Sequence, residues 1–177
     1  EPILPLVDKI IVASKELEKA LKIRIDKPLT VIPDHVEGAK LTPYFNPEIK
    51  RIKLLWFGYS SNLNSLYDFL PQLSALTDEV RVALSIVTNW DEYLLDLFRH
   101  GRNRIQIKHV NWSLENMKQE LNNCDLVIIP SSYNSASITK TANKVLTSLY
   151  AGRYVVAYPI PAYLEFLQFI SIGENLL

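Results

Sequence analysis

Four short runs of this chain are apolar at nearly every position, and they constrain its fold more than any other feature. They are IKLLWFG (52–58), VRVALSIVT (80–88), DLVIIP (125–130) and YVVAYPI (154–160). Strands of this kind are buried on both faces, which requires a parallel sheet with helices on either side. Amphipathic stretches separate these runs, and IQIKHV (105–110) reads as a further strand. The alternation predicts an α/β fold, a doubly wound parallel sheet with helices on both faces.

The helices expected between the strands follow the same alternation. They are predicted at 62–76, 91–100 and 113–121, in the stretch that begins near Ser137, and at 162–170. Ligands of such sheets bind beyond the carboxyl ends of the strands, where loops lead into helix N-termini. The loops that could form a site are therefore 58–62, 88–91, 111–113, 130–144 and 159–163.

The first 50 residues have a different organisation. A strand, a helix and a strand are predicted at 10–14, 15–23 and 29–33. Residues 34–50 are polar and aperiodic, as in a linker. We therefore assign 1–50 to the end of a preceding domain plus an interdomain segment, and 51–177 to a second domain. The start EPILPLVDKI has neither Met nor a basic leader, so we expect a fragment of a longer protein.

The composition does not favour a nucleic-acid partner or a membrane-spanning segment. Lysine plus arginine and aspartate plus glutamate each number 19, so no global charge favours nucleic acid. No apolar run of about 18 residues exists, so we expect no transmembrane segment. The single cysteine, Cys124, cannot form an internal disulfide and fits a reducing compartment. We expect a cytoplasmic protein, with peripheral attachment at the inner face of the membrane left open for the full-length protein.

The stretch SITKTANKVLTSLYAGRYVVAYPIP places Lys140 and Lys144 at the start of a predicted helix. The helix dipole disfavours a cation there by about 0.3–1 kcal/mol. No acidic residue occurs between Asp125 and Glu165 to offset them. This combination of helix start, strand end and missing acids predicts a site for an anion. The alternative is a pair of solvated surface lysines.

A bound phosphate would reverse this local penalty. At about 4 Å and an effective dielectric constant of 20, one charge pair contributes on the order of 4 kcal/mol before desolvation. Free backbone N–H groups at the helix start would add to that. We expect Thr139 or Thr141 to cap the helix, Lys140 and Lys144 to share one helical face, and Arg153 to add to the positive field.

The order of these segments resembles a known family. CDLVIIPSS (124–132) followed by KTANKVLTSLYAGRYVVAYPIPAYLEF (140–166) resembles the C-terminal, donor-binding domain of glycosyltransferases with the GT-B fold. WFGYSSNLNSL (56–66) resembles the opening strand and loop of that Rossmann-like domain. VIPDHVE (31–37) is similar to the interdomain segment, and IIVASKELEKAL (10–21) to the end of the N-terminal half.

The resemblance implies transfer of a sugar from a nucleoside-diphosphate sugar to a saccharide or lipid-linked acceptor, as in polysaccharide biosynthesis. Lys140 and Lys144 would act on the departing diphosphate. The other implied donor contacts are Gly58, Ser60 and Asn62 on the phosphate side, Asn111 and Trp112 near the base, Ser131, Ser132 and Tyr133 on the cleft floor, and Thr141, Asn143 and Glu165. The family implies no metal and no further cofactor. An acceptor site and any general base would come from the missing N-terminal domain, so the fragment would be inactive alone.

One departure from the family concerns two glutamates, eight positions apart, that many retaining members carry. Thr139 and Thr147 stand at these places. Ribose recognition and the stereochemical outcome therefore stay open.

Three other functions compete with a transferase. A non-catalytic module that binds a nucleotide sugar would keep the anion site. An epimerase would have only Glu165 and His109 as its acid and base. A flavodoxin-like or receiver-like domain would need acids after the first strand, and GYSSN has none.

The remaining notable side chains are assigned structural roles. Trp56, Trp90 and Cys124 are expected in the core, and His35 lies in the linker. His100 falls at a predicted helix end, where its positive form is mildly favourable.

Overall fold

A computed structural model describes residues 3–36, 40–43, 51–77, 80–89 and 105–173. The helix predicted at 91–100, with Trp90 and His100, lies outside the described residues. The first part of the chain forms a small unit with a parallel two-stranded sheet. Its elements are η1 (Leu4–Leu6), β1 (Ile10–Val12), α1 (Lys15–Lys22) and β2 (Leu29–Val31). Ser14 caps α1, because its side chain accepts a hydrogen bond from the N–H of Leu17.

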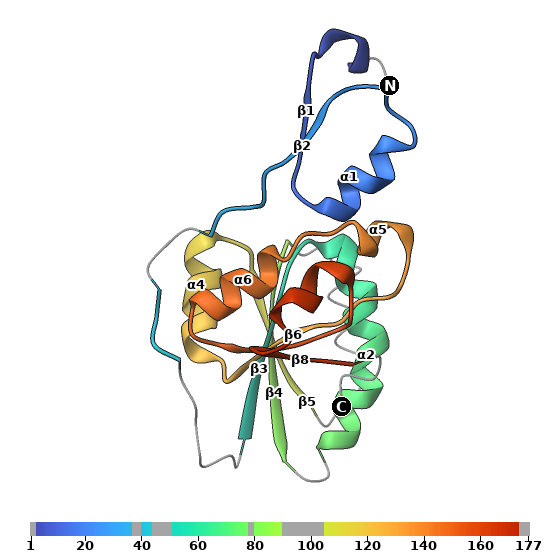
Figure 1. The fold of residues 1–177 in the computed structure, drawn as a ribbon. Coiled ribbons are helices and arrows are strands. Elements are labelled where there is room, and N and C mark those ends of the chain that lie inside the picture. The colour runs from blue at the N-terminus through green and yellow to red at the C-terminus, as the bar shows by residue number, and fades with distance from the viewer. Residues whose placement is uncertain (1–2, 37–39, 44–50, 78–79, 90–104, 174–177) are drawn as a thin grey trace.

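The rest of the chain forms a larger unit, which lies below the small one in Figure 1. Its strands are β3 (Arg51–Phe57), β4 (Arg81–Thr88), β5 (Ile105–Asn111), β6 (Leu126–Ile129), β7 (Tyr154–Ala157) and β8 (Ile170–Ile172). Its described helices are η2 (Ser60–Asn62), α2 (Leu63–Leu76), α4 (Leu114–Asn123), α5 (Ser135–Ile138), α6 (Asn143–Tyr150) and η3 (Pro161–Phe166).

The six strands are parallel and lie in the order β5-β4-β3-β6-β7-β8. The chain builds outward from β3 on one side and then returns to build outward from β6 on the other. This arrangement confirms the predicted doubly wound, Rossmann-like α/β fold. The order reverses between β3 and β6, which is where such sheets bind ligands.

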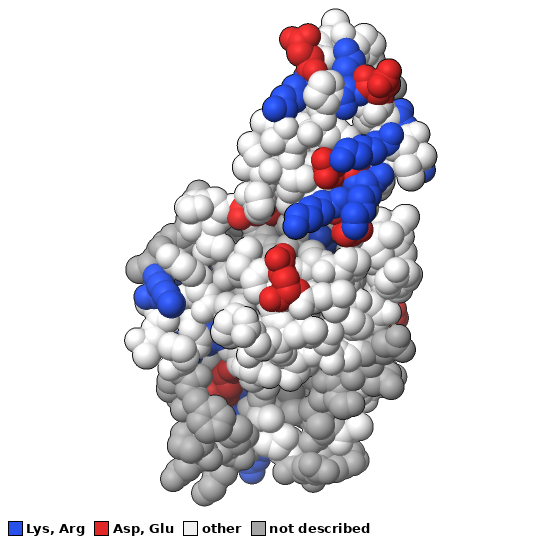
Figure 2. All heavy atoms as spheres, viewed as in Figure 1, with Lys and Arg blue, Asp and Glu red and all other residues white. Residues whose placement is uncertain are grey.

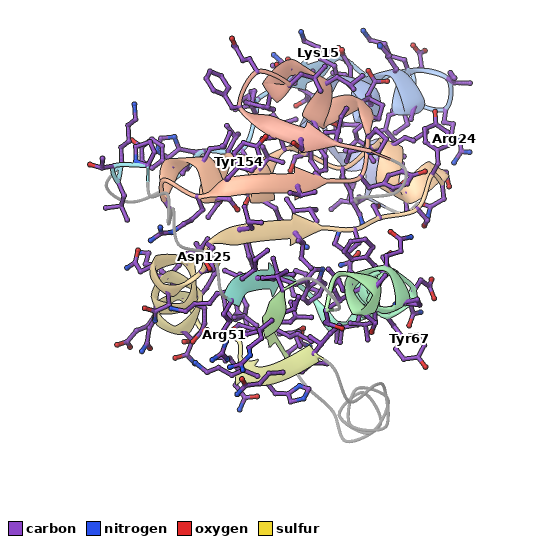
Figure 3. All side chains as sticks on the ribbon, turned by 90° about the horizontal axis from the view of Figure 1, so that it is seen from below. Lys15, Arg24, Arg51, Tyr67, Asp125 and Tyr154 are labelled. Atoms are coloured by element: carbon purple, nitrogen blue, oxygen red, sulfur yellow. The ribbon has the colours of Figure 1, made fainter. Side chains whose placement is uncertain are left out.

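Alternate side chains of β3 enter two separate cores, which is why this strand is apolar at successive positions. Leu54 and Trp56 pack with α2 on one face, and Leu55 and Phe57 pack with α4 and α6 on the other. Figure 3 shows α2 and α4 on opposite sides of the sheet. Trp56 is 1% exposed, as predicted for a core residue. Cys124 is also buried, and burial raises the pKa of its thiol to about 12.

The helix predicted around the two lysines is interrupted. Residues 135–138 form α5, residues 139–142 form no helix, and α6 begins at Asn143. The Thr139 hydroxyl donates to the carbonyls of Ser135 and Ala136, at 3.3 and 3.1 Å. A threonine hydroxyl that occupies carbonyls in this way competes with helix propagation, which explains the break.

The end of the chain also differs from the prediction. The expected helix at 162–170 is a 3₁₀-helix over Pro161–Phe166, and strand β8 follows it. Val155 of β7 pairs with Ile170 of β8. Tertiary pairing with an existing strand therefore prevails over the helical pattern of this stretch.

Candidate functional site

The candidate site lies where the strand order reverses. The chain leaves β3 through Gly58 into η2, and leaves the adjacent strand β6 through residues 130–134 into α5. Because both strands are parallel, these two loops meet at the same edge of the sheet. Lys140, which follows α5, and Lys144 of α6 approach the loop after β3 there.

Lys144 of α6 projects onto the carboxyl end of β3. Its Nζ lies 4.9 Å from the ring centroid of Trp56 and 5.9 Å from that of Phe57. A Cβ placed on Gly58 would lie 2.5 Å from the same Nζ. The absence of a side chain at Gly58 thus makes room for the ammonium group. Burial, followed by the charge of Lys140, lowers the pKa of Lys144 from 10.5 to about 8.

Lys140 reaches the same loop from a different backbone position. Its Nζ donates a hydrogen bond to Oδ1 of Asn62 at 3.0 Å. Desolvation by burial lowers the pKa of Lys140. The expectation that both lysines share one helical face is wrong, because Lys140 lies before the helix. Even so, both ammonium groups face the loop after β3. Within the described residues, neither forms an ion pair with a carboxylate.

The start of α6 has no capping side chain. Its N-cap residue is Ala142, and the N–H of Leu146 makes the first bond of the helix, to the Ala142 carbonyl. The prediction that Thr139 or Thr141 caps this helix is therefore wrong. Thr139 bonds back to α5, and Thr141 bonds to Asp34. Uncapped N–H groups at a helix start are suited to an anion.

The loop after β3 is held by residues that follow β4. The Thr88 hydroxyl donates to the Gly58 carbonyl at 2.7 Å, and the Ser60 N–H donates to Oδ1 of Asn89 at 3.2 Å. Gly58, Ser60 and Asn62, all predicted site residues, thus belong to one braced loop. Sequence reasoning missed Thr88 and Asn89 as individual residues, although both lie in the loop 88–91 that the fold had indicated.

Thr141, Asn143 and Glu165 line a different cavity, between the small and large units. This pocket has a volume of about 460 Å³. It is lined by Ala13, Ser14, Lys15, Glu16, Val31, Pro33, Asp34, Thr141, Ala142, Asn143, Leu146, Pro161, Ala162, Leu164, Glu165 and Phe166. Most of the coloured side chains on the face in Figure 2 lie on the small unit and at its junction with the large one. The pocket combines carboxylates and hydroxyls with an apolar wall.

The residues predicted on the cleft floor serve partly to form α5. The Ser137 hydroxyl donates a hydrogen bond to the Ser132 carbonyl. Nδ2 of Asn134 donates another to the Ser132 hydroxyl, at 2.9 Å. Ser131 precedes them and is half-buried. Tyr133 is 70% exposed and lines an open apolar pocket formed mainly by residues 158–161. The structure therefore places this trio on the loop that leads into α5, and the pocket lined by Tyr133 shares Pro161 and Leu164 with the pocket that contains Thr141.

Asn111 and Trp112 lie at the carboxyl end of β5, the edge strand. The Trp112 N–H donates to the Thr88 carbonyl at 2.9 Å, and the Asn111 carbonyl accepts from Nδ2 of Asn116 at 2.9 Å. The indole of Trp112 is 56% exposed. These residues share the sheet edge with the lysines but are separated from β3 by β4.

Arg153 does not contribute to this positive field, contrary to expectation. It follows the opposite end of α6 and is buried. Its Nε and Nη2 donate to the carbonyls of Leu121 and Asn122, at 2.6 and 2.7 Å. Arg153 therefore stabilises the C-terminal end of α4, where carbonyl groups lack helical partners.

The part of the chain that the structure describes contains no cluster of three or more His, Cys, Asp or Glu side chains that could hold a metal ion. It also contains no helix long and apolar enough to span a membrane. The groups that the structure brings together around the loop after β3 are two ammonium groups, the uncapped N–H groups of α6 and neutral polar side chains.

Comparison with known proteins supports this assignment of the fold. No family model and no curated protein sequence matches the chain. A point mutant of S. aureus TarM, in complex with fondaparinux, α-GlcNAc-glycerol and UDP, matches with a TM-score of 0.62 and 12% identity. Pneumococcal O-GlcNAc transferase GtfA, in complex with UDP and GlcNAc, matches with a TM-score of 0.54 and 12% identity. Apo OtsA matches with a TM-score of 0.60 and 10% identity.

These structures define the class of fold. The chain has the GT-B glycosyltransferase fold that its sequence resemblance predicted. The matches cover 98%, 91% and 99% of this chain for TarM, GtfA and OtsA, respectively. They cover 36% of TarM, 32% of GtfA and 53% of OtsA. The chain thus spans about a third of the length of TarM and GtfA, and corresponds to a part of such proteins.

Proposed function

We propose that this chain is the donor-binding part of a glycosyltransferase that uses a nucleoside-diphosphate sugar. One observation carries the proposal: the ammonium groups of Lys140 and Lys144 face the loop after β3, at the point where the strand order reverses. Two cations without a carboxylate partner among the described residues suit a ligand with two adjacent phosphates. UDP in the similar TarM and GtfA structures is consistent with this ligand class.

The same lysines account for catalysis in physical terms. The diphosphate gains negative charge as the bond to the sugar breaks. Lys140, Lys144 and the uncapped start of α6 then interact more strongly with the transition state than with the bound donor, which lowers the barrier. These groups supply positive charge from the protein itself, so the proposed reaction needs no metal cofactor.

The remaining predicted residues divide among the parts of the donor. Gly58, Ser60 and Asn62 would border the phosphates, and Asn111 and Trp112 the base. The pocket between the units would take the sugar, beside Thr141, Asn143 and Glu165, because its carboxylates and amide suit hydroxyl groups and its apolar wall suits a sugar face. Ser131, Ser132 and Tyr133 would border the sugar from the β6 side.

The acceptor site and any general base would belong to a part of the protein that lies outside this chain. We propose a saccharide or lipid-linked acceptor, a role in polysaccharide synthesis, and a cytoplasmic location. Isolated, the chain would bind a donor or a diphosphate weakly and transfer no sugar. Detectable sugar transfer by the isolated chain would contradict this division of labour.

The proposal is tested by calorimetric titration of UDP, GDP and their sugars into the wild type and the Lys140→Ala/Lys144→Ala variant. We expect the wild type to bind one nucleotide series and the variant to lose at least tenfold in affinity, or about 1.4 kcal/mol. Lys53→Ala is a matched control, since Lys53 lies near the opposite end of β3. Equal affinity of the wild type and the double variant would remove the lysines from the site.

A further inference from the structure

The short segment that carries Lys140 is bonded to the small unit on both sides of that lysine. The Ser14 hydroxyl donates to the Thr139 carbonyl at 2.9 Å. The Thr141 hydroxyl donates to Oδ2 of Asp34 at 2.5 Å. These partners are 125 and 107 positions apart in the sequence. Residues on either side of Lys140 are therefore attached to a different unit from the one that contains the lysine.

Within its own unit, this segment is held at its two ends, by the bonds of the Thr139 hydroxyl to α5 and by the burial of Ala142 in the core. Residues 139–142 belong to neither α5 nor α6. The Lys140 N–H donates a hydrogen bond at 3.1 Å to the carbonyl of Ser137, which lies in the last turn of α5. A non-helical segment between two short helices has several accessible backbone conformations, and bonds to a neighbouring unit restrict them.

The interdomain segment is bonded to the rest of the molecule both before and after Asp34. The Ile32 N–H donates to the Val12 carbonyl, which continues the pairing of the small sheet. Further along, the Leu41 N–H donates to the carbonyl of Tyr150 at the C-terminal end of α6. A Cβ on Gly152 would lie 2.4 Å from the Thr42 carbonyl oxygen. The interdomain segment thus contacts Thr141, just before the start of α6, through Asp34, and the C-terminal end of α6 through Leu41 and Thr42.

We propose that Asp34 and Ser14 are positioning residues: by holding residues 139–142 against the small unit, they keep Lys140 directed at the proposed diphosphate site. The strength of anion binding then depends on the contact between the two units. This inference rests on the proposed function, since the diphosphate is the donor's. It adds that part of the donor site is set by residues that touch no donor atom.

Substitution of Asp34 separates this role from a simple effect of charge, because the two predict opposite signs. If Asp34 acted only as a nearby negative charge, its removal would strengthen anion binding by the lysines. If it positions Lys140, Asp34→Ala weakens binding. Asp34→Asn keeps an oxygen that can accept from Thr141 and removes the charge, so it restores binding.

The experiment titrates inorganic pyrophosphate and UDP into the wild type, Asp34→Ala, Asp34→Asn, Lys140→Ala and the Asp34→Ala/Lys140→Ala double variant. We expect Asp34→Ala to bind about three- to tenfold more weakly and Asp34→Asn to bind like the wild type. On the Lys140→Ala background, Asp34→Ala should have no further effect, because it acts through Lys140. Full additivity of the two changes, or binding by Asp34→Ala as tight as the wild type, would overturn the inference.

Glu18→Ala provides the matched control. It removes one negative charge from the same small unit, and its carboxylate pairs with Lys22 at 2.9 Å. Its affinity for pyrophosphate should equal that of the wild type. Ser14→Gly tests the second bond, because glycine is tolerated at the N-cap of α1 and adds no charge, but has no hydroxyl to donate to the Thr139 carbonyl. Weaker binding of pyrophosphate is expected.

Hydrogen exchange keeps the inference testable if the wild type binds neither ligand, a result that would count against the proposed function alone. We expect the amide of Lys140 to exchange faster in Asp34→Ala than in the wild type, and at the wild-type rate in Asp34→Asn. Unchanged exchange in Asp34→Ala would overturn the positioning role whatever the ligand.

Discussion

The Nζ of Lys144 occupies the space that a side chain on Gly58 would fill, 2.5 Å from the position of its Cβ. The glycine therefore has a steric function at the candidate site. Its backbone φ of +156° is also one that residues with a side chain rarely adopt. The steric contact connects the loop after β3 with the first turn of α6, although Gly58 and Lys144 are 86 positions apart in the sequence (144 − 58).

Gly58→Ala should displace the Lys144 ammonium and weaken diphosphate binding by at least tenfold. The unfavourable φ should lower the free energy of unfolding by about 1–3 kcal/mol. Calorimetric titration and urea unfolding measure the two effects. On a Lys144→Ala background the new methyl group meets no ammonium, so Gly58→Ala should lower stability less. An equal loss of stability on both backgrounds would show that the steric contact has no effect.

Binding of a diphosphate should depend on pH through Lys144. Its pKa of about 8 in the folded protein lies below the ordinary value of 10.5, so about half of the amine has lost its proton at pH 8. A bound anion favours the charged amine, so binding is accompanied by proton uptake above about pH 8. Affinity should fall as the pH rises from about 7.5 to 9.

Calorimetry in two buffers of different ionisation enthalpy measures this uptake. Lys144→Met, which lacks the titrating amine, should bind more weakly and show a flatter pH profile than the wild type. The free energy of unfolding of the unliganded protein should change with pH in the opposite direction to the affinity. Between pH 8 and 10.5 the unfolded chain binds more protons at Lys144 than the folded protein does, so this residue should make stability rise with pH. Equal proton uptake by the wild type and Lys144→Met would exclude Lys144 as the titrating group.

Trp112→Ala should separate recognition of the base from recognition of the phosphates. The indole is 56% exposed, so its loss should change the free energy of unfolding by less than about 0.5 kcal/mol. Stacking of a base on an aromatic ring contributes about 1–3 kcal/mol. The variant should therefore bind UDP more weakly and bind pyrophosphate as the wild type does. An unchanged affinity for UDP would remove Trp112 from the base site.

Arg153→Ala should affect stability and leave the anion site unchanged. Truncation removes the donors to the carbonyls of Leu121 and Asn122, and hydrogen bonds to a charged group contribute about 1.5–3 kcal/mol. We expect a loss of about 2–4 kcal/mol in urea unfolding, partly recovered by Arg153→Lys. Pyrophosphate affinity should stay at the wild-type value under conditions where the variant is folded. A weaker affinity of the variant for pyrophosphate would show that the charge of Arg153 does contribute to anion binding.

The fold was largely predictable from sequence because its signal is local. Residues 52–58 and 154–160 are apolar enough to identify buried parallel strands without knowledge of their neighbours. In α6, Val145 is buried and Gly152 adopts φ +68° just beyond the helix. Strand β8 was missed because three residues carry little periodicity, and its pairing with β7 decides its conformation.

The candidate site was predictable only in part. The lack of acids near Lys140 and Lys144 indicated an anion site, and the structure places these lysines beside Gly58 and Asn62, which the resemblance had implied as donor contacts. The break between α5 and α6 was not foreseen, because it depends on where one threonine hydroxyl bonds. The partnership of Asp34 with Thr141 was not foreseen either.

By itself, the sequence determined a layered α/β architecture and a local excess of positive charge between Asp125 and Glu165. Both follow from residue types over short distances, which local propensity and charge counting can detect. The tertiary structure alone decided that Lys144 rests against Gly58, that Lys140 reaches Asn62, and that Arg153 turns away to α4. The physical reason is that a long side chain has many accessible directions, and only the packing of distant segments selects one of them.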